Sequence, residues 1–281
     1  MPYDDGAPLP PELADAIERA RPRLGRLGAP LLFYPTIGST NDVALARGAA
    51  DWSASPSSSP SASRSPLDGL VVVADEQTAG RGRRGHQWFS PAGSGLYVSV
   101  VLAPATARVD PARATTLLTL AAGVAVAEGI EAATGLRVDL KWPNDLQVSR
   151  RKLAGILAEA AGAVVVGYGI NVAATAFPSE LRDRATSLES ELGRLVDRHH
   201  VLAETLVALS SRYEDLLAGR FDAILDAWRA RAPDASGARV SWTTAAGERS
   251  GVTAGIDDRG ALLVRDGEVV ERVVSGEIKW L

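Results

Sequence analysis

The sequence has no cysteine and only three histidines in 281 residues. Without cysteine the chain can form no disulfide and can hold no metal through thiolates. The histidines are His86, His199 and His200, too few for an easily built zinc site of imidazoles. These absences disfavour a disulfide-stapled secreted scaffold and a zinc enzyme, and they suit a reducing compartment.

The chain also lacks an excess of basic residues. It carries 30 Lys and Arg against 34 Asp and Glu, a net charge of −4. Nucleic-acid binding needs clustered positive charge, so that class is disfavoured. No uninterrupted apolar run reaches the ~18 residues of a membrane span. Residues 1–12 are acidic and proline-rich, unlike a secretory signal. We therefore expect a cytoplasmic protein that binds neither DNA nor a membrane.

What is present is an ordinary globular composition, with 46% apolar and 23% charged residues. Apolar spacing, β-branched runs and capping residues give the expected order of elements. We expect helices over 11–27 (disrupted at Pro22), from Ser39 or Thr40 to about 50, over 110–134 and over most of 196–231; strands are expected over 69–77, 95–104, 136–142, 152–161 and 163–173.

The chain is expected to contain two domains. Residues 1–29 are an N-terminal extension, 30–235 form a mixed α and β domain, and 236–281 form a small β-barrel. The last unit has five short β-runs, and Asp-Gly is a strong hairpin signal. A unit below ~70 residues rarely stands alone, so it should pack on the large domain. Residues 53–66 hold eight serines and three prolines, which predicts a disordered insertion.

The segment Gly80-Arg81-Gly82-Arg83-Arg84-Gly85 is the most informative motif. Its glycines permit positive φ and allow backbone N–H groups to turn inward around an anion. Three arginines in four positions suit a phosphate or a carboxylate. A flexible basic surface loop, or a nucleic-acid-binding Gly-Arg tract, is an equally good explanation of this segment alone. The spacing fits neither a P-loop nor a Rossmann fingerprint.

Three further segments carry residues suited to a nucleotide. Residues 141–145 read Lys-Trp-Pro-Asn-Asp, which offers a charge for phosphate, an oxygen for Mg²⁺ and a flat apolar surface. A plain turn explains it as well. Residues 151–157 read RKLAGIL, where Lys152 opens a strand and is either functional or merely solvated. Residues 167–171 read GYGIN, where two glycines indicate either a close ligand or a bulge.

The order of these segments strongly resembles the biotin–protein ligase family. Further matches are GSTN at 38–41, EQTA at 76–79 and GEI at 276–278, so the resemblance covers about 33–281. It implies an α+β fold: a mixed-sheet catalytic domain (30–235) related to class II aminoacyl-tRNA synthetases, then an SH3-like barrel. It also implies an ATP-dependent ligase that makes biotinyl-5′-AMP and transfers biotin to a lysine of a biotin carboxyl carrier protein.

The resemblance assigns roles to individual residues, all by position in this sequence. It implies catalytic roles for Arg83, Lys152 and Lys141. It places biotin against Ser39, Thr40, Asn41, Gln77, Gly80, Arg81, Gly82, Arg83, Lys152 and Gly155. It places ATP against Arg83, Arg84, Trp88, Lys141, Asn144, Asp145 and Asn171, with Asp145 as a ligand of Mg²⁺.

Some features depart from the family or stay open. His86 stands where bacterial relatives often carry Arg, which puts that contact in doubt. Only 37 residues precede Gly38, so we expect no DNA-binding domain of the kind found in repressor relatives. A homodimer remains open. Trp228 and Trp280 are expected in the core or at a domain interface. The alternative functions are a lipoate–protein ligase and a non-catalytic sensor of biotinyl-adenylate.

Overall fold

The computed structural model describes residues 3–54, 67–161, 163–174, 177–244, 247–274, 276 and 278–281. Nearly all of the insertion predicted over 53–66 therefore lies outside the described residues.

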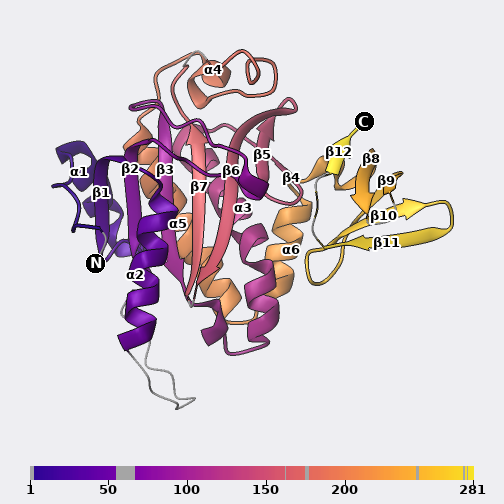
Figure 1. Cartoon of the computed structure of the whole chain (residues 1–281), viewed down its shortest axis with the longest axis horizontal. Helices are drawn as coiled ribbons and strands as arrows, with labels where there is room; N and C mark the ends of the chain where they lie inside the picture. The colour runs from indigo at the N-terminus through magenta and orange to yellow at the C-terminus, as the bar shows by residue number, and fades with distance from the viewer. Residues whose placement is uncertain are drawn as a thin grey trace.

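A seven-stranded mixed sheet forms the centre of the large domain (Figure 1), in the order β1-β2-β3-β7-β6-β5-β4. Only β1 and β2 pair in parallel; every other neighbouring pair is antiparallel. The strands are β1 (Leu31–Ile37), β2 (Val71–Gln77), β3 (Gly95–Leu102), β4 (Asp139–Lys141), β5 (Asp145–Val148), β6 (Arg151–Ala161) and β7 (Ala163–Asn171). Every residue of β3 is buried, as its almost unbroken apolar sequence predicts.

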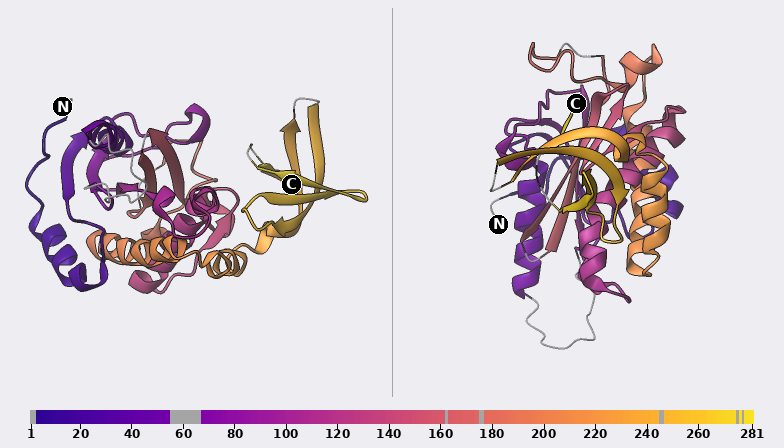
Figure 2. Two further views of the ribbon diagram at one scale, coloured as in Figure 1. Left: turned by 90° about the horizontal axis from the view of Figure 1, so that it is seen from below. Right: turned by 90° about the vertical axis from the view of Figure 1, so that its right-hand side faces the viewer.

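Helices cover both faces of this sheet (Figure 2, left). The helix α2 (Thr40–Ala54) packs on β2, β3, β6 and β7. On the opposite face lie α3 (Pro111–Thr134), α5 (Arg198–Leu217) and α6 (Phe221–Arg229), while α4 (Leu188–Leu192) is one short turn. The helix α3 is long and apolar enough to span a membrane, but most of it is buried in the core. Its side chains pack against α5 and the sheet.

The N-terminal segment is part of this packing. The helix α1 (Pro11–Ala20) ends in a 3₁₀ turn, Arg21–Arg23, at the predicted Pro22 break. Its apolar face packs on α5 and contributes buried side chains to the main core, namely Leu13, Ala16, Ile17 and Ala20. Arg23 donates two hydrogen bonds to Glu204 of α5, at 2.9 and 2.6 Å.

The C-terminal domain is a five-stranded, all-antiparallel sheet in the order β11-β10-β9-β8-β12. Its strands are β8 (Ser236–Thr244), β9 (Gly247–Ile256), β10 (Leu262–Asp266), β11 (Val269–Val273) and β12 (Ile278–Trp280). The sheet lies to one side of the large domain (Figure 2, left) but shares its hydrophobic core. The Trp142 indole donates to the Gly260 carbonyl at 3.0 Å across the junction.

The expected elements occur in the predicted order, and two strands were missed. The structure confirms the predicted helices, the Pro22 break, the five β-runs of the C-terminal domain and all five predicted strands of the large domain, of which β4 is shorter than expected. It adds β1 (Leu31–Ile37), where no strand was predicted, and β5, which begins at Asp145, where the sequence indicated only a turn. Asp145 therefore lies on a strand and pairs with both Lys141 and Gly155.

Candidate active site

The main cavity has a volume of about 690 Å³ and lies where β2, α2, β6 and β7 meet the Lys141–Asp145 turn and the C-terminal domain. Its wall carries far more positive than negative charge. The cationic side chains are Arg81, Arg83, Arg84, Lys141, Arg150, Lys152, Arg184 and Lys279; the acidic ones are Asp145 and Asp183. Such a wall favours an anionic ligand.

The glycine–arginine loop follows β2 and forms one side of the cavity. A Cβ at Gly80 would lie 2.6 Å from both the Ser90 hydroxyl and the Trp88 carbonyl, so the close packing requires glycine. Arg84 has a φ of 57°, the left-handed region that L side chains rarely adopt. Arg83 donates to Asn144 Oδ1 at 3.2 Å. Burial and then the charge of Arg84 lower the pKa of Arg83 below its ordinary value.

A polar cluster lies at the start of α2. The Gln77 side-chain oxygen accepts from the Thr40 backbone N–H at 2.9 Å and from its hydroxyl at 3.1 Å. The Ser99 hydroxyl of β3 lies 2.8 Å from Thr40 Oγ1 and 2.5 Å from Asn41 Oδ1. Thr40, Asn41 and Ser99 are buried. Thr40, Asn41 and Gln77 line the cavity as a polar floor, and Ser99 lies buried behind them.

Arg81 is held by two carboxylates at the entrance to this floor. It forms ion pairs with Asp42 and with Glu159, the latter at 2.9 Å. Burial works against the charge, but the two carboxylates outweigh it and raise the pKa of Arg81. The guanidinium remains about a third exposed, so a ligand can still reach it.

Lys152 extends from β6 into the middle of the cavity. Its Nζ lies 2.6 Å from Asp145 Oδ1 and 5.4 Å from the centre of the Trp88 ring. The indole of Trp88 rests on the sheet where Gly155 and Gly169 pair across β6 and β7. A Cβ on Gly169 would lie 2.4 Å from the indole nitrogen. The indole N–H is buried and has no hydrogen-bond partner among the described residues.

The third side of the cavity lies beside the C-terminal domain. The Lys141 Nζ stands 5.7 Å from the centre of the Trp280 ring. Burial lowers the pKa of Lys141, which Asp145 partly offsets. Asn171 ends β7 and donates to the Thr186 carbonyl at 3.0 Å, which fixes the loop after that strand. Lys141 is thus a desolvated cation placed to gain from a phosphate.

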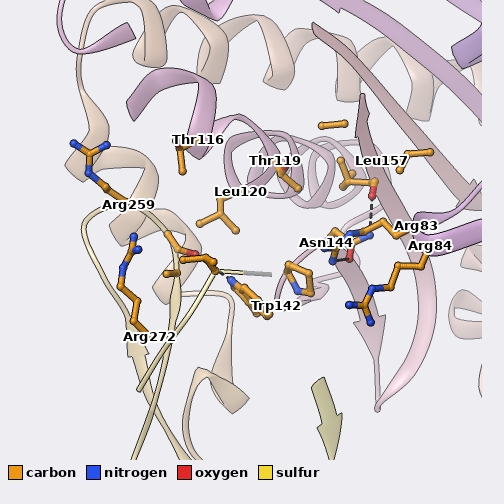
Figure 3. Close-up of a pocket in the computed structure, with 16 residues that line it drawn as sticks. Arg83, Arg84, Thr116, Thr119, Leu120, Trp142, Asn144, Leu157, Arg259 and Arg272 are labelled. Carbon is orange, nitrogen blue, oxygen red and sulfur yellow. Dashed lines mark hydrogen bonds between the residues drawn. The ribbon is translucent and has the colours of Figure 1, made fainter. Parts of the chain in front are cut away.

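A second cavity of about 370 Å³ lies beyond the Trp142–Asn144 turn, between α3 and the C-terminal domain (Figure 3). Arg83, Arg84, Trp142 and Asn144 belong to the walls of both cavities. Figure 3 shows Arg83 and Arg84 on one side of it and Arg259 and Arg272 on the other. The turn therefore divides two adjoining basic spaces.

The structure brings nearly all the sequence-predicted site residues into one wall. Those lining the main cavity are Ser39, Thr40, Asn41, Gln77, Arg81, Gly82, Arg83, Arg84, Trp88, Lys141, Asn144, Asp145, Lys152, Gly155 and Asn171. Gly80 is not among them, because it lies beneath the loop against Ser90. His86 lines the cavity and is exposed.

Sequence reasoning did not find several residues of this region. Ser99 and Glu159 lie inside strands, where nothing in the local pattern separates them from ordinary strand residues. Trp228 is buried as expected, whereas Trp280 is half-buried at the domain junction and also lines the cavity. No group of three or more His, Asp or Glu side chains that could hold a metal occurs in the described parts of the chain.

Known proteins are similar to this chain in both sequence and fold. Residues 59–173 match the "Biotin/lipoate A/B protein ligase family" and 235–279 match the "Biotin protein ligase C terminal domain". The chain is 35% identical over 250 residues to the biotin–[acetyl-CoA-carboxylase] ligase of Mycobacterium tuberculosis, covering 87% of this chain and 86% of that protein. The chain belongs to the biotin–protein ligase family.

Two further members extend the comparison. The bifunctional ligase/repressor BirA of Bacillus spizizenii is 39% identical over 220 residues, and the match covers 75% of this chain but 66% of that longer protein. The biotin protein ligase of Aquifex aeolicus, solved with biotin and ATP, superposes with a TM-score of 0.73 at 29% identity, over 89% of this chain and 98% of that one. The family fold thus includes both domains described above.

Proposed function

We propose that this protein is a biotin–protein ligase, which uses ATP to activate biotin and then transfers it to a lysine of a biotin carboxyl carrier protein. The observation that carries the proposal is the convergence of Arg83, Lys152 and Asp145 on one cationic cavity from three separate segments of the chain. The similar Aquifex aeolicus structure contains biotin and ATP, and the relative from Mycobacterium tuberculosis is named for this activity.

In the first step, a biotin carboxylate oxygen attacks the α-phosphorus of ATP, and pyrophosphate leaves. Negative charge grows on the phosphate oxygens, where Arg83, Lys152 and Lys141 can stabilise it. Lys152 is paired with Asp145, at 2.6 Å, and must turn toward the ligand to do so. In the second step, a neutral carrier amine attacks the carbonyl of the mixed anhydride, AMP leaves, and the nitrogen loses a proton.

Mg²⁺ fits this site only as an ion coordinated mainly by the phosphates of ATP. Asp145 offers one carboxylate, beside the Asn144 amide oxygen. One carboxylate plus substrate phosphates is a usual way to hold Mg²⁺, whose charge would offset that of the phosphates. Engagement of Asp145 by Mg²⁺ would free Lys152 from its ion pair.

We place the reaction in the cytoplasm, because a chain without cysteine suits a reducing compartment.

The proposed activity is tested by measuring pyrophosphate release from ATP by the purified protein, with biotin, with lipoate and with neither. We expect release with biotin alone, and a carrier domain that gains one biotin by intact mass. Release only with lipoate would identify a lipoate ligase. Biotin binding without pyrophosphate release would indicate a sensor.

A further inference from the structure

Glu159 of β6 lies behind the cavity wall and touches two side chains that form it. Its Oε2 accepts from Asn41 Nδ2 at 2.6 Å and from Arg81 Nη2 at 2.9 Å. Asn41 and Arg81 line the cavity, whereas Glu159 does not. Glu159 therefore acts on a ligand through these two neighbours.

The carboxylate of Glu159 fixes which way the Asn41 amide faces. An ionised carboxylate only accepts hydrogen bonds, so the amide must turn its Nδ2 toward Glu159 and its Oδ1 toward Ser99. The amide lies directly on β7, since a Cβ at Gly167 would lie 2.2 Å from Asn41 Oδ1.

The Gln77 amide is oriented independently at the other end of the cluster. Its oxygen accepts from the Thr40 backbone N–H at 2.9 Å, and its Nε2 donates to the Ser90 hydroxyl at 3.1 Å. Two amide oxygens therefore face each other across the hydroxyls of Ser99 and Thr40.

The hydrogen atoms in this row can be counted. The three contacts are Asn41 Oδ1 to Ser99 Oγ at 2.5 Å, Ser99 Oγ to Thr40 Oγ1 at 2.8 Å, and Thr40 Oγ1 to Gln77 Oε1 at 3.1 Å. Each hydroxyl supplies one hydrogen, so two hydrogens serve three contacts. The Thr40 backbone N–H adds a hydrogen only at Gln77 Oε1, which leaves the four oxygens of the row with three hydrogens. Ser99 is fully buried. The row is thus one donor short.

We infer that Glu159 is a positioning residue for biotin recognition: by accepting from Asn41 Nδ2 it keeps the Asn41–Ser99–Thr40–Gln77 row rich in acceptors. An N–H of a cyclic urea supplies the missing donor. This inference rests on the proposed function, since the biotin ring carries such a urea. A polar group left without its partner in a buried site weakens binding, so the direction of the Asn41 amide matters for affinity.

Glu159→Gln tests this directly. The new amide can donate to Asn41 Oδ1, which allows Asn41 to turn its Nδ2 toward Ser99. Three hydrogens then serve the three contacts, and the row no longer needs a donor. We expect the KM for biotin in biotin-dependent ATP–pyrophosphate exchange to rise about tenfold or more. We expect kcat at saturating biotin within about threefold of the wild type, and an unreduced Tm.

Asn41→Asp is expected to compensate for Glu159→Gln when the two substitutions are combined. Alone, it places two carboxylates face to face, and we expect a raised KM for biotin. Combined with Glu159→Gln, it restores an acceptor-only group facing Ser99, now held by the new amide. We expect the double variant to recover a KM within about threefold of the wild type, a result that loss of packing at either site does not produce.

Asp42→Asn is the matched control, because Asp42 pairs with Arg81 but makes no described hydrogen bond to Asn41. We expect its KM for biotin to stay within about threefold of the wild type. An equal rise in KM for Asp42→Asn and Glu159→Gln, a double variant no better than Glu159→Gln, or an unfolded Glu159→Gln would each overturn the inference. Wild-type protein without biotin-dependent exchange would instead overturn the proposed function.

Discussion

Lys152 and Asp145 form an ion pair whose two partners both line the cavity, and each is about a third exposed. Such a pair contributes little to stability, about 0–1 kcal/mol, because water competes for both partners. The position of Lys152 over the Trp88 ring is therefore better explained by a ligand that replaces Asp145 as the partner of Lys152. The charge of Lys152 is available to a carboxylate or phosphate at a small energetic cost.

Lys152→Ala should slow biotinyl-adenylate formation by about 100-fold or more, because it removes a cation aimed at the charge that grows in the transition state. Single-turnover formation of the adenylate measures this step. Arg151→Ala is the matched control, since the adjacent Arg151 pairs with Glu191 and does not line the cavity. A rate within about threefold of the wild type for Lys152→Ala would show that another residue carries this role.

The contact between Arg23 and Glu204 ties the N-terminal segment to α5 and titrates in acid. The hydrogen bonds from Arg23 lower the pKa of Glu204 below its ordinary value near 4.5, against the opposing effect of burial. A lowered pKa in the folded state means that the contribution to stability is present above that ordinary value. It is lost as the pH falls through the lowered pKa.

Glu204→Gln should therefore lower the free energy of unfolding at neutral pH by less than about 1 kcal/mol, since Arg23 is half-exposed. The difference from the wild type should shrink as the pH falls below about 4, in urea titrations at each pH. Glu18→Gln is the control, because Glu18 is exposed and its contact with Arg21 is 3.9 Å long. A difference that does not depend on pH would contradict the assigned titration.

At the scale of elements, the helices α3 and α5 pack closely against each other at Gly129. A Cβ there would lie 2.4 Å from Thr205 Cα, a backbone atom that cannot move without moving α5. Gly123, in the same helix, has only Leu140 Cδ2 nearby, at 3.5 Å. Substitution of Gly129 therefore tests a steric requirement, whereas substitution of Gly123 tests helix propensity alone.

Gly129→Ala should destabilise the protein by about 1–3 kcal/mol, because overpacking outweighs the gain of about 1 kcal/mol in helix propensity. Gly123→Ala should leave the stability unchanged or raise it by up to about 1 kcal/mol. Urea unfolding of both variants measures the contrast. Equal stabilities would mean that the two helices can separate without cost.

Periodicity alone was enough to predict the long elements, and motif order was enough to predict most of the cavity wall. The first helix ends at the predicted Pro22 break, and β6 begins at Arg151, one residue before the predicted Lys152. The strand β1 was missed, and the short strand β5 was missed because four residues after a Pro-Asn turn carry no periodic signal. The role of Glu159 depends on its distance from Asn41, 118 positions earlier, which no local pattern contains.

At the scale of the whole molecule, the two sheets form one hydrophobic core. Val240, Trp242 and Leu262 of the C-terminal domain belong to the same buried cluster as α3 and β3. The hydrogen bond from Trp142 to Gly260 crosses this junction next to the cavity. The domain of about 45 residues is therefore expected to depend on the larger one for its stability.

Urea unfolding followed by tryptophan fluorescence and by far-UV circular dichroism should give one coincident transition. Trp142→Phe should keep that single transition but lower the free energy of unfolding by about 1 kcal/mol, since the Gly260 carbonyl loses its donor. Two separated transitions in the wild type would show that the domains unfold independently.

The cationic wall of the cavity has a kinetic consequence, because the protein as a whole is acidic, with a net charge of −4. Long-range repulsion and local attraction act together on an approaching anion, and low-dielectric walls concentrate the attraction at the entrance. Added salt screens charges over about 8–10 Å near physiological ionic strength. In stopped-flow experiments the association rate of ATP should therefore fall as salt rises, while the dissociation rate changes less.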